Sequence, residues 1–225
     1  MRIRGMIFDM DGTLLDSMEM WRSLDSRFLR AHGVEPPPDI SDIVKTMTVE
    51  EGSAYYAERF GLGITPQQVS DEIEEMAAAA YREYLPLKPY ALEFLEMAGE
   101  NGIRCAVASA TYSKLLSAAI DRLGIREQFV CILTPQEGYA GKDTPELYLA
   151  AAEQIGAKPE EIIVFEDALH AAETAKRAGF YVVGMAEPLY ADEWAQMQAV
   201  CDRTISGWQE ICGQDFFTQI KKQKV

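Results

Sequence analysis

Two acidic residues, Asp9 and Asp11, directly follow an apolar segment near the start of the chain. Side chains alternate along a strand, so positions i and i+2 point the same way, and both carboxylates are expected where this strand ends at Gly12 and Thr13. Two like charges this close repel each other unless a cation or a shared proton intervenes. The pair therefore indicates a reaction centre, although an Asp-Gly turn without chemistry would use the same residue types.

Three further polar groups occur later in the chain, in the order Ser109-Ala110, Lys142 and Glu166-Asp167. In a doubly wound sheet, ligands bind outside the carboxyl ends of the strands, so these groups are expected to converge on one crevice with the first acidic pair. Each group also has a simpler interpretation. Ser109 could cap a helix, Lys142 could be a solvated surface lysine, and the second acidic pair could lie at a helix N-terminus, where the macrodipole favours negative charge.

Apolar runs alternate with helical periodicity along most of the chain. The runs expected to form buried strands span residues 6–8, 103–108, 129–133, 162–165 and 181–183. This alternation predicts an α/β fold, a Rossmann-like doubly wound parallel sheet whose strands are joined by right-handed crossovers. About ninety residues separate the first run from the second, far more than one crossover needs.

Amphipathic helices fill that long interval and predict an inserted helical domain over residues 16–84. One helix is expected to begin at about Ser17 and a second near Glu50. A third has a clear start signal, with Thr65 as N-cap and Pro66 at the first helical position.

The remaining residues, 1–15 and 85–225, would form the α/β core domain. Because the insertion follows the first acidic pair directly, it could act as a cap beside that pair. Such a cap would open for substrate and close to exclude water.

The four polar groups, in this order and with a helical insertion after the first, resemble the haloacid dehalogenase-like superfamily, in its branch with a helical C1-type cap of the phosphoglycolate phosphatase and β-phosphoglucomutase type. The first motif of that superfamily, D-x-D-G-T-[LV], is matched completely by residues 9–14. The resemblance implies that Asp9 is a nucleophile that attacks phosphorus and forms an aspartyl-phosphate. It also implies that Asp11 is the general acid that protonates the leaving alcohol and then, as a base, activates water.

Magnesium is the cofactor that this resemblance implies, because carboxylates, a carbonyl and water form the all-oxygen site that a hard cation prefers. The implied ligands are the side chains of Asp9 and Asp167 and the backbone carbonyl of Asp11. Glu166 would act from outside the coordination sphere, by orienting a metal-bound water or Lys142.

The same resemblance assigns the phosphate-binding groups. Ser109 and the backbone N–H of Ala110 would hold phosphoryl oxygens, and Lys142 would neutralise charge as the phosphoryl group transfers. With Asp9 and Asp11, Ser109 and Lys142 complete the implied catalytic set.

Asp11 favours phosphoryl chemistry within the superfamily, since haloacid dehalogenases lack a carboxylate there and phosphonoacetaldehyde hydrolases typically carry a small residue. We expect a magnesium-dependent phosphomonoesterase that acts on a small phosphorylated metabolite. One alternative is a sugar phosphomutase, whose branch commonly has His where this chain has Trp21 and a basic residue where it has Val49. A second alternative is a non-catalytic phosphate-binding regulator that has kept the fold.

Three residues of the expected cap, Trp21, Lys45 and Thr48, are candidate substrate contacts. Trp21 could equally serve to pack the cap. The chain also departs from the family pattern in places, for example at Tyr90, where Gly often follows the linker proline.

The 225 residues carry a formal net charge of −15, which disfavours nucleic acid and anionic membranes as partners. An anionic substrate would then need local positive charge from a metal ion or a placed lysine. The four cysteines lie far apart and there are only two histidines, so zinc sites and disulfide frameworks are not expected. With neither a secretory nor a membrane-spanning pattern in the sequence, we expect a cytoplasmic protein that is a monomer or weak dimer.

Overall fold

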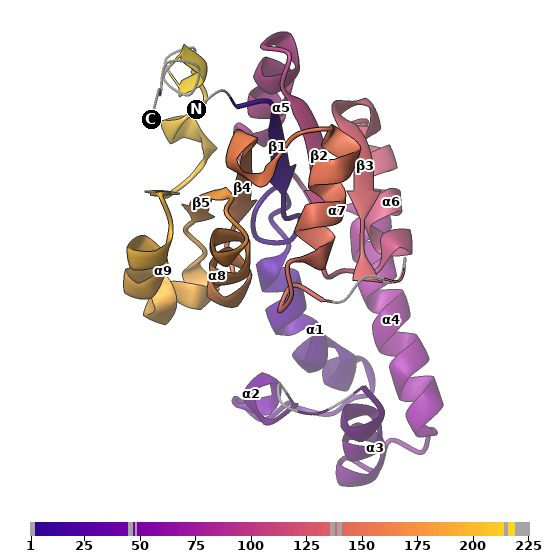
Figure 1. Ribbon diagram of the computed structural model, residues 1–225. Helices are drawn as coiled ribbons and strands as arrows, with labels where there is room; N and C mark the ends of the chain where they lie inside the picture. Colours follow the sequence, from indigo (N-terminus) through magenta and orange to yellow (C-terminus); the bar gives the residue numbers. More distant parts are fainter. Residues whose placement is uncertain are drawn as a thin grey trace. The chain divides into compact units, whose positions relative to one another are not determined.

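The computed structural model describes residues 3–44, 47, 49–135, 138, 141–213 and 216–218. The chain divides into two compact units (Figure 1). The first comprises Met1–Asp16 and Pro86–Val225 and is called the core unit; the second, Ser17–Leu85, is called the helical unit. Each boundary lies one residue beyond the boundary predicted for the inserted domain.

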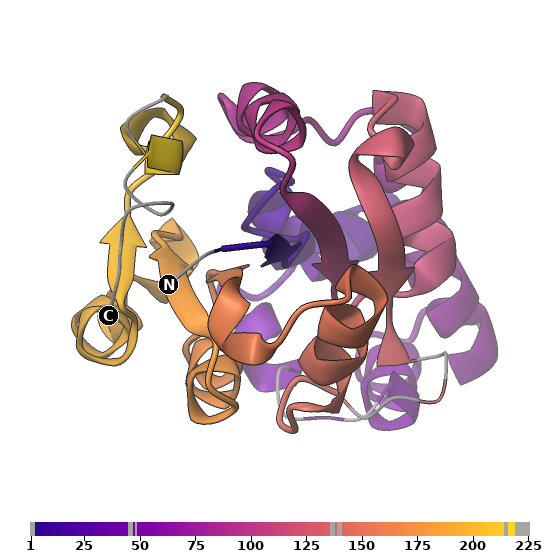
Figure 2. The ribbon, with the colours of Figure 1, turned by 45° about the horizontal axis from the view of Figure 1, so that its top comes forward.

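A parallel sheet with the strand order β3-β2-β1-β4-β5-β6 forms the centre of the core unit (Figure 1, Figure 2). The five predicted apolar runs all coincide with strands, so the predicted doubly wound α/β fold is confirmed. The sixth strand, β6, was not predicted. The strands are β1 (Gly5–Phe8), β2 (Arg104–Ala108), β3 (Phe129–Leu133), β4 (Ile162–Glu166), β5 (Tyr181–Met185) and β6 (Arg203–Ile205).

Helices cover both faces of this sheet, as its apolar central strands require. On one face, α7 (Glu146–Ile155) packs on β1, β2 and β3, and α8 (Leu169–Arg177) packs on β4 and β5. The opposite face is covered by α5 (Ala91–Glu100), as Figure 2 shows. Phe94 of this helix packs against Phe8. Further helical segments of the core unit include α6 (Ser113–Leu123), α9 (Trp194–Val200) and the short 3-10 helices Arg126–Gln128, Pro159–Glu161, Pro188–Glu193 and Trp208–Glu210.

The register of the central strands determines where the acidic residues at their ends lie. Phe8, the last residue of β1, lies beside Val107 of β2 and Phe165 of β4. The residues that follow, Asp9 after β1 and Glu166 at the end of β4, therefore emerge side by side. Parallel strands present their carboxyl ends at one edge of the sheet, which is where ligands bind in folds of this type.

The helical unit has a small core of its own, in which Phe28, Ile40 and Tyr56 are buried together. Its third predicted helix begins as predicted, since the Thr65 side chain accepts from the Gln68 N–H in a capping box. The helices are α1 (Met18–Ala31), α2 (Ile40–Val44), α3 (Val49–Arg59) and α4 (Pro66–Glu83); of these, the short α2 was not predicted.

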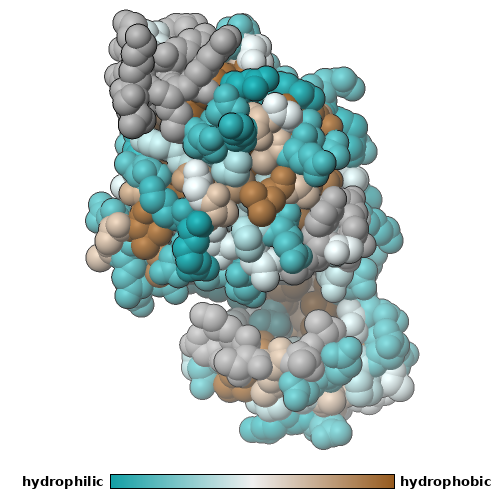
Figure 3. All heavy atoms as spheres, in the orientation of Figure 1, coloured by the Kyte–Doolittle hydropathy of each residue, from teal (hydrophilic) through white to brown (hydrophobic). Residues whose placement is uncertain are grey.

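Hydrophilic side chains cover most of the face drawn in Figure 3, and hydrophobic ones occur there in separate small areas. None of the helices in the described ranges is both long and apolar enough to cross a bilayer.

Candidate active site

A tight turn follows β1 and carries the first acidic pair. The Asp9 N–H donates to the Phe165 carbonyl of β4 at 3.0 Å, and the Leu15 N–H donates back to the Met10 carbonyl at 2.7 Å. Gly12 lies in this turn with φ 81°, a conformation that costs glycine little and other residues more. The turn thus fixes the backbone of both aspartates, with Asp9 buried and Asp11 partly exposed.

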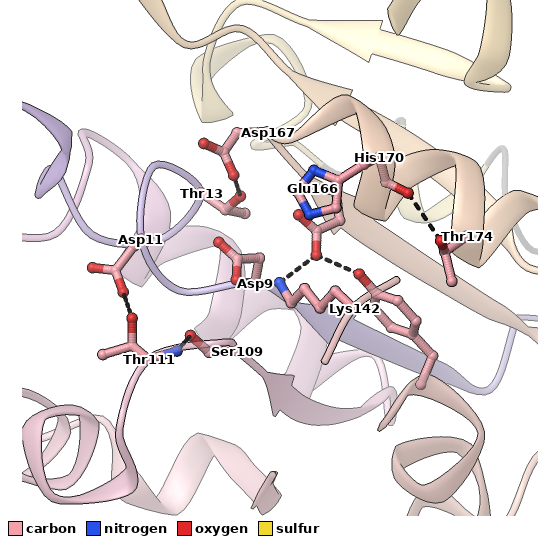
Figure 4. Close-up of polar contacts among 11 residues, drawn as sticks. Asp9, Asp11, Thr13, Ser109, Thr111, Lys142, Glu166, Asp167, His170 and Thr174 are labelled. Carbon is pink, nitrogen blue, oxygen red and sulfur yellow. Dashed lines mark hydrogen bonds and ion pairs between the residues drawn. The ribbon is translucent and has the colours of Figure 1, made fainter. Parts of the chain in front are cut away.

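Three carboxylates meet beyond the ends of β1 and β4. One carboxylate oxygen from each of Asp9, Glu166 and Asp167 lies within 4.8 Å of the others, and all three residues are buried (Figure 4). The sequence predicted this convergence because each acid directly follows, or ends, an apolar run.

Lys142 reaches the same cluster from the segment before α7. Its Nζ donates to Asp9 Oδ1 and to Glu166 Oε1, and the whole residue is only 6% exposed. The interpretation of Lys142 as a solvated surface lysine is therefore wrong.

A tyrosine that the sequence analysis did not single out completes this arrangement. The hydroxyl of Tyr148, in the first half of α7, donates to Glu166 Oε1 at 2.6 Å. The available signal was a hydroxyl-bearing aromatic residue on the otherwise apolar buried face of a helix that begins shortly after Lys142.

The electrostatics of the cluster reflect an excess of negative charge. Burial raises the pKa of Asp9 to about 7, against the opposing effect of Lys142 and with smaller increases from Glu166 and Asp11. Burial and the nearby Asp9 also raise the pKa of Asp167 well above its usual range. Although burial alone would lower the pKa of Lys142, the attraction of Asp9 and Glu166 raises it, so the lysine is charged. Among the described residues, three carboxylates thus face the Lys142 cation.

The donor set of this cluster fits a divalent cation. Its oxygen atoms are the hard ligands that Mg²⁺ and Ca²⁺ prefer. Glu166 Oε2 is buried and has no hydrogen-bond partner among the described residues, a costly arrangement unless something binds there. Glu166, predicted to act from outside the coordination sphere, thus also offers an oxygen to an ion.

The carboxylate of Asp11 lies apart from the cluster and faces the loop after β2 (Figure 4). Thr111 Oγ1 donates to Asp11 Oδ2 at 2.7 Å, and the Thr111 N–H donates to Ser109 Oγ at 3.2 Å. Ser109 is buried and anchored by its own N–H to the Leu133 carbonyl at 3.1 Å, whereas Ala110 is exposed. Thr111 was not predicted, and its place two residues after Ser109 was the only signal for it.

The predicted cap residues have different outcomes. Trp21 lies on α1 of the helical unit, where its indole N–H donates to the Tyr81 hydroxyl at 3.0 Å. The indole N–H of Trp21 therefore has its hydrogen-bond partner inside the helical unit. Lys45 and Thr48 lie outside the described residues.

Comparisons with known proteins agree with the architecture. A family model described as a haloacid dehalogenase-like hydrolase matches residues 3–179. A phosphorylated carbohydrates phosphatase from Thermotoga maritima is 26% identical over 177 residues, 79% of this chain and 82% of that protein. Hexitol phosphatase B from Escherichia coli K12 is 26% identical over 182 residues, 79% of this chain and 81% of that protein. The crystal structure of CbbY from Rhodobacter sphaeroides in complex with phosphate has the same fold, with a TM-score of 0.74, 22% identity, and 96% and 99% of the two chains covered.

Proposed function

Because the chain belongs to the haloacid dehalogenase-like hydrolase family, we propose that it is a metal-dependent phosphomonoester hydrolase with Asp9 as its nucleophile. The enzyme class is that of the curated phosphatases to which it is similar. Those relatives are phosphatases of phosphorylated carbohydrates and hexitols, so the proposed substrate is a small phosphorylated metabolite.

The observation that carries this proposal is the setting of Asp9. Its carboxylate lies at the end of the central strand, held by Lys142, beside Asp167 and close to the loop that carries Ser109. A buried carboxylate held in place next to a cation is suited to nucleophilic attack on a phosphoryl group.

The reaction would proceed in two displacements. In the first, an oxygen of Asp9 bonds to phosphorus while the bond from phosphorus to the leaving oxygen breaks, and protonated Asp11 gives its proton to that oxygen. In the second, water attacks the phosphorus of the aspartyl-phosphate and passes a proton to Asp11, while the bond from phosphorus to Asp9 breaks. Inorganic phosphate and an alcohol are the products, and both aspartates return to their starting states.

Three groups of the core unit would stabilise the transferring phosphoryl group. The Ser109 hydroxyl and the Ala110 N–H would donate to its oxygens, at the start of the loop that leads into α6. Lys142 would offset the charge that accumulates as the phosphoryl group moves.

Magnesium fits the proposed mechanism as the resident ion. The Asp9 and Asp167 side chains and the Asp11 backbone carbonyl would hold it, with Glu166 positioning Lys142. When bound, the ion supplies positive charge to the phosphoryl oxygens and keeps Asp9 ionised.

We further propose that the helical unit is a cap that carries substrate contacts. The two chain connections to it leave the core unit side by side, since the Asp16 N–H donates to the Pro86 carbonyl at 3.0 Å and Leu15 bridges to Leu87. The outgoing connection follows directly on the turn that carries Asp9 and Asp11, and the returning connection pairs with it. Trp21, Lys45 and Thr48 remain the candidate contacts within the helical unit.

The proposed activity is tested by phosphate release from a panel of sugar and polyol phosphates, with and without Mg²⁺. We expect turnover by the unmodified protein that requires the ion and that falls by a factor of about 10³ or more in Asp9→Asn, which keeps the shape of the side chain but not its charge. Circular dichroism would show that this variant is folded.

Equal phosphate release by Asp9→Asn, or no release from any ester of a broad panel, would refute the phosphatase. Conversion of glucose 1-phosphate to glucose 6-phosphate, without net release of phosphate, would instead select the phosphomutase. Phosphate binding without turnover of any ester would select the non-catalytic regulator.

A further inference from the structure

Thr111 links the two functional groups that the proposed mechanism keeps separate, the phosphate-binding loop and the proton-transferring aspartate. Its backbone N–H donates to Ser109 Oγ at 3.2 Å, and its side-chain hydroxyl donates to Asp11 Oδ2 at 2.7 Å. Figure 4 shows Thr111 and Asp11 pointing toward each other, on the side of Asp9 away from Lys142.

The loop that carries Thr111 is well anchored. It begins at the end of β2, where the Ser109 N–H is bonded to β3, and it runs into the first turn of α6 at Ser113. A hydroxyl on such a loop has a defined position, so the hydrogen bond also defines the direction of one Asp11 oxygen.

Orientation matters for a group that transfers a proton. The turn after β1 fixes the backbone of Asp11, but backbone geometry leaves several side-chain rotamers open. Proton transfer to a leaving oxygen requires the carboxyl group within hydrogen-bond reach of it. A neighbouring donor that selects one rotamer reduces the cost of reaching that geometry.

We propose that Thr111 is a positioning residue that orients the carboxyl group of Asp11 toward the leaving oxygen. This inference rests on the proposed phosphatase function. In the first displacement, the proton moves from Asp11 to the leaving oxygen as the bond from phosphorus to that oxygen breaks, and the Thr111 hydroxyl then donates to the resulting carboxylate. In the second, that carboxylate accepts a proton from the attacking water.

Two esters of similar size separate this role from a structural one. Phenolate is a basic leaving group that benefits from a proton, whereas p-nitrophenolate leaves without one. In Thr111→Val, which removes the hydroxyl and keeps the shape, we expect kcat/KM for phenyl phosphate to fall about 10- to 100-fold and that for p-nitrophenyl phosphate to fall less than about threefold. This ratio reports the first displacement alone, since kcat/KM does not include hydrolysis of the phosphoenzyme.

Two further variants serve as controls. Thr111→Ser keeps the hydroxyl and is expected to restore the kcat/KM for phenyl phosphate to within about threefold of the unmodified protein. Thr174→Val makes the same chemical change in α8, where the buried hydroxyl donates to the His170 carbonyl at 2.9 Å, and it should leave the ratio of the two esters unchanged. If Thr111→Val does not fold, Thr111→Ala gives the same comparison.

Equal losses on both esters in Thr111→Val, or no loss on either, would overturn the positioning role while leaving the phosphatase intact. Failure of the unmodified protein to hydrolyse these two esters and every ester of the broad panel would overturn the phosphatase itself, and this inference with it.

Discussion

Lys142 supplies the positive charge that offsets the carboxylates of the candidate site. It is the cation that faces the Asp9, Glu166 and Asp167 carboxylates, and it contacts two of them. Removing one member of a buried ion pair leaves an uncompensated charge and is costly. Tyr148 adds a neutral donor to Glu166 from α7 and so helps to fix the acid that holds the lysine.

Metal binding at this site should depend on pH, because protons and the cation compete for the same oxygens. The pKa of Asp9 is raised to about 7 and that of Asp167 is also raised, so lowering the pH from 8 to 6 protonates Asp9. A protonated carboxylate is a poor ligand and must release its proton on binding. We expect the affinity for Mg²⁺, measured by calorimetric titration, to weaken at least about tenfold between pH 8 and pH 6.

The same pKa shift predicts the sign of the effect on the metal-free protein. The folded-state pKa of Asp9 lies above its ordinary value of 3.8, so this group stabilises the fold below pH 3.8 and loses its contribution as the pH rises through about 7. Asp121→Asn, a matched change at an exposed ion pair with Arg126, should leave the metal affinity and its pH dependence unaltered. An affinity that is equal at both pH values, or stronger at pH 6, would contradict the competition.

The sequence predicted those site residues that follow a strong local signal. Asp9 and Glu166-Asp167 end apolar runs, and the parallel topology brings them together independently of the conformations of the loops. Thr111 and Tyr148 could not be predicted in the same way, because their partners lie 100 and 18 positions away in the chain. Their contacts depend on loop geometry and helix rotation, which no short motif specifies. The roles of all these residues, and the role of the helical unit as a cap, stay predictions.

At the scale of elements, the segment that connects the helical unit back to the core unit has an unusual backbone conformation. Lys88 donates its N–H to the Leu14 carbonyl at 2.8 Å and pairs with Glu187 at 2.8 Å, with both side chains largely buried. Two residues later, Tyr90 precedes α5 with φ 65° and is 52% exposed. This left-handed conformation explains why glycine is frequent at this position in the family pattern, and it costs a residue with a Cβ atom.

Tyr90→Gly is expected to raise the free energy of unfolding by about 0.5 to 1 kcal/mol, because relief of the steric cost outweighs the added flexibility of the unfolded chain. The side chain is half exposed, so little packing is lost. Urea unfolding followed by circular dichroism measures the change. Tyr90→Ala is the matched control, since it removes the ring but keeps Cβ, and a gain in Tyr90→Ala as large as in Tyr90→Gly would show that backbone strain is not the cause.

Elements with a continuous apolar run or a helix cap in their sequence were predicted well. Two short elements, β6 and α2, were not predicted. β1 and β4 are buried throughout, and α4 has a capping box. Two of the three residues of β6, Arg203–Ile205, are polar, so they form no apolar run, and pairing with β5 makes them a strand. The five-residue α2 forms within the small core of the helical unit rather than through its own propensity.

At the scale of the core unit as a whole, segments from opposite ends of the chain share one aromatic cluster. Trp208 is fully buried, with ring centroids 4.8 Å from Phe94, 5.0 Å from Phe165 and 5.8 Å from Phe8. This tryptophan lies beyond the residues matched by the family model, in a part of the chain to which the sequence analysis assigned no role. The cluster fills the sheet face beneath the strands that carry the candidate site.

Trp208 also contacts the turn that carries Asp9 and Asp11. Its indole N–H donates to the Thr13 carbonyl at 3.0 Å, and the Thr13 hydroxyl donates to Asp167 Oδ1 at 3.4 Å. Trp208→Phe keeps an aromatic ring but removes the N–H donor, so the buried Thr13 carbonyl loses this hydrogen bond. We expect the free energy of unfolding to fall by about 1 to 3 kcal/mol and the affinity for Mg²⁺ to weaken several-fold, because the turn with Asp9 and the Asp167 contact both lose support.

The comparison that isolates this support is Trp194→Phe, the same change at the partly exposed start of α9, outside the turn that carries Asp9 and Asp11. It should lower stability less and leave Mg²⁺ affinity as it is, when both variants are titrated by calorimetry well below their melting temperatures. If Trp208→Phe lost stability but bound Mg²⁺ like the unmodified protein, the C-terminal segment would contribute only to the core. A loss of affinity confined to Trp208→Phe would instead mean that a residue about 195 positions from Thr13 helps to set the geometry of the metal ligands.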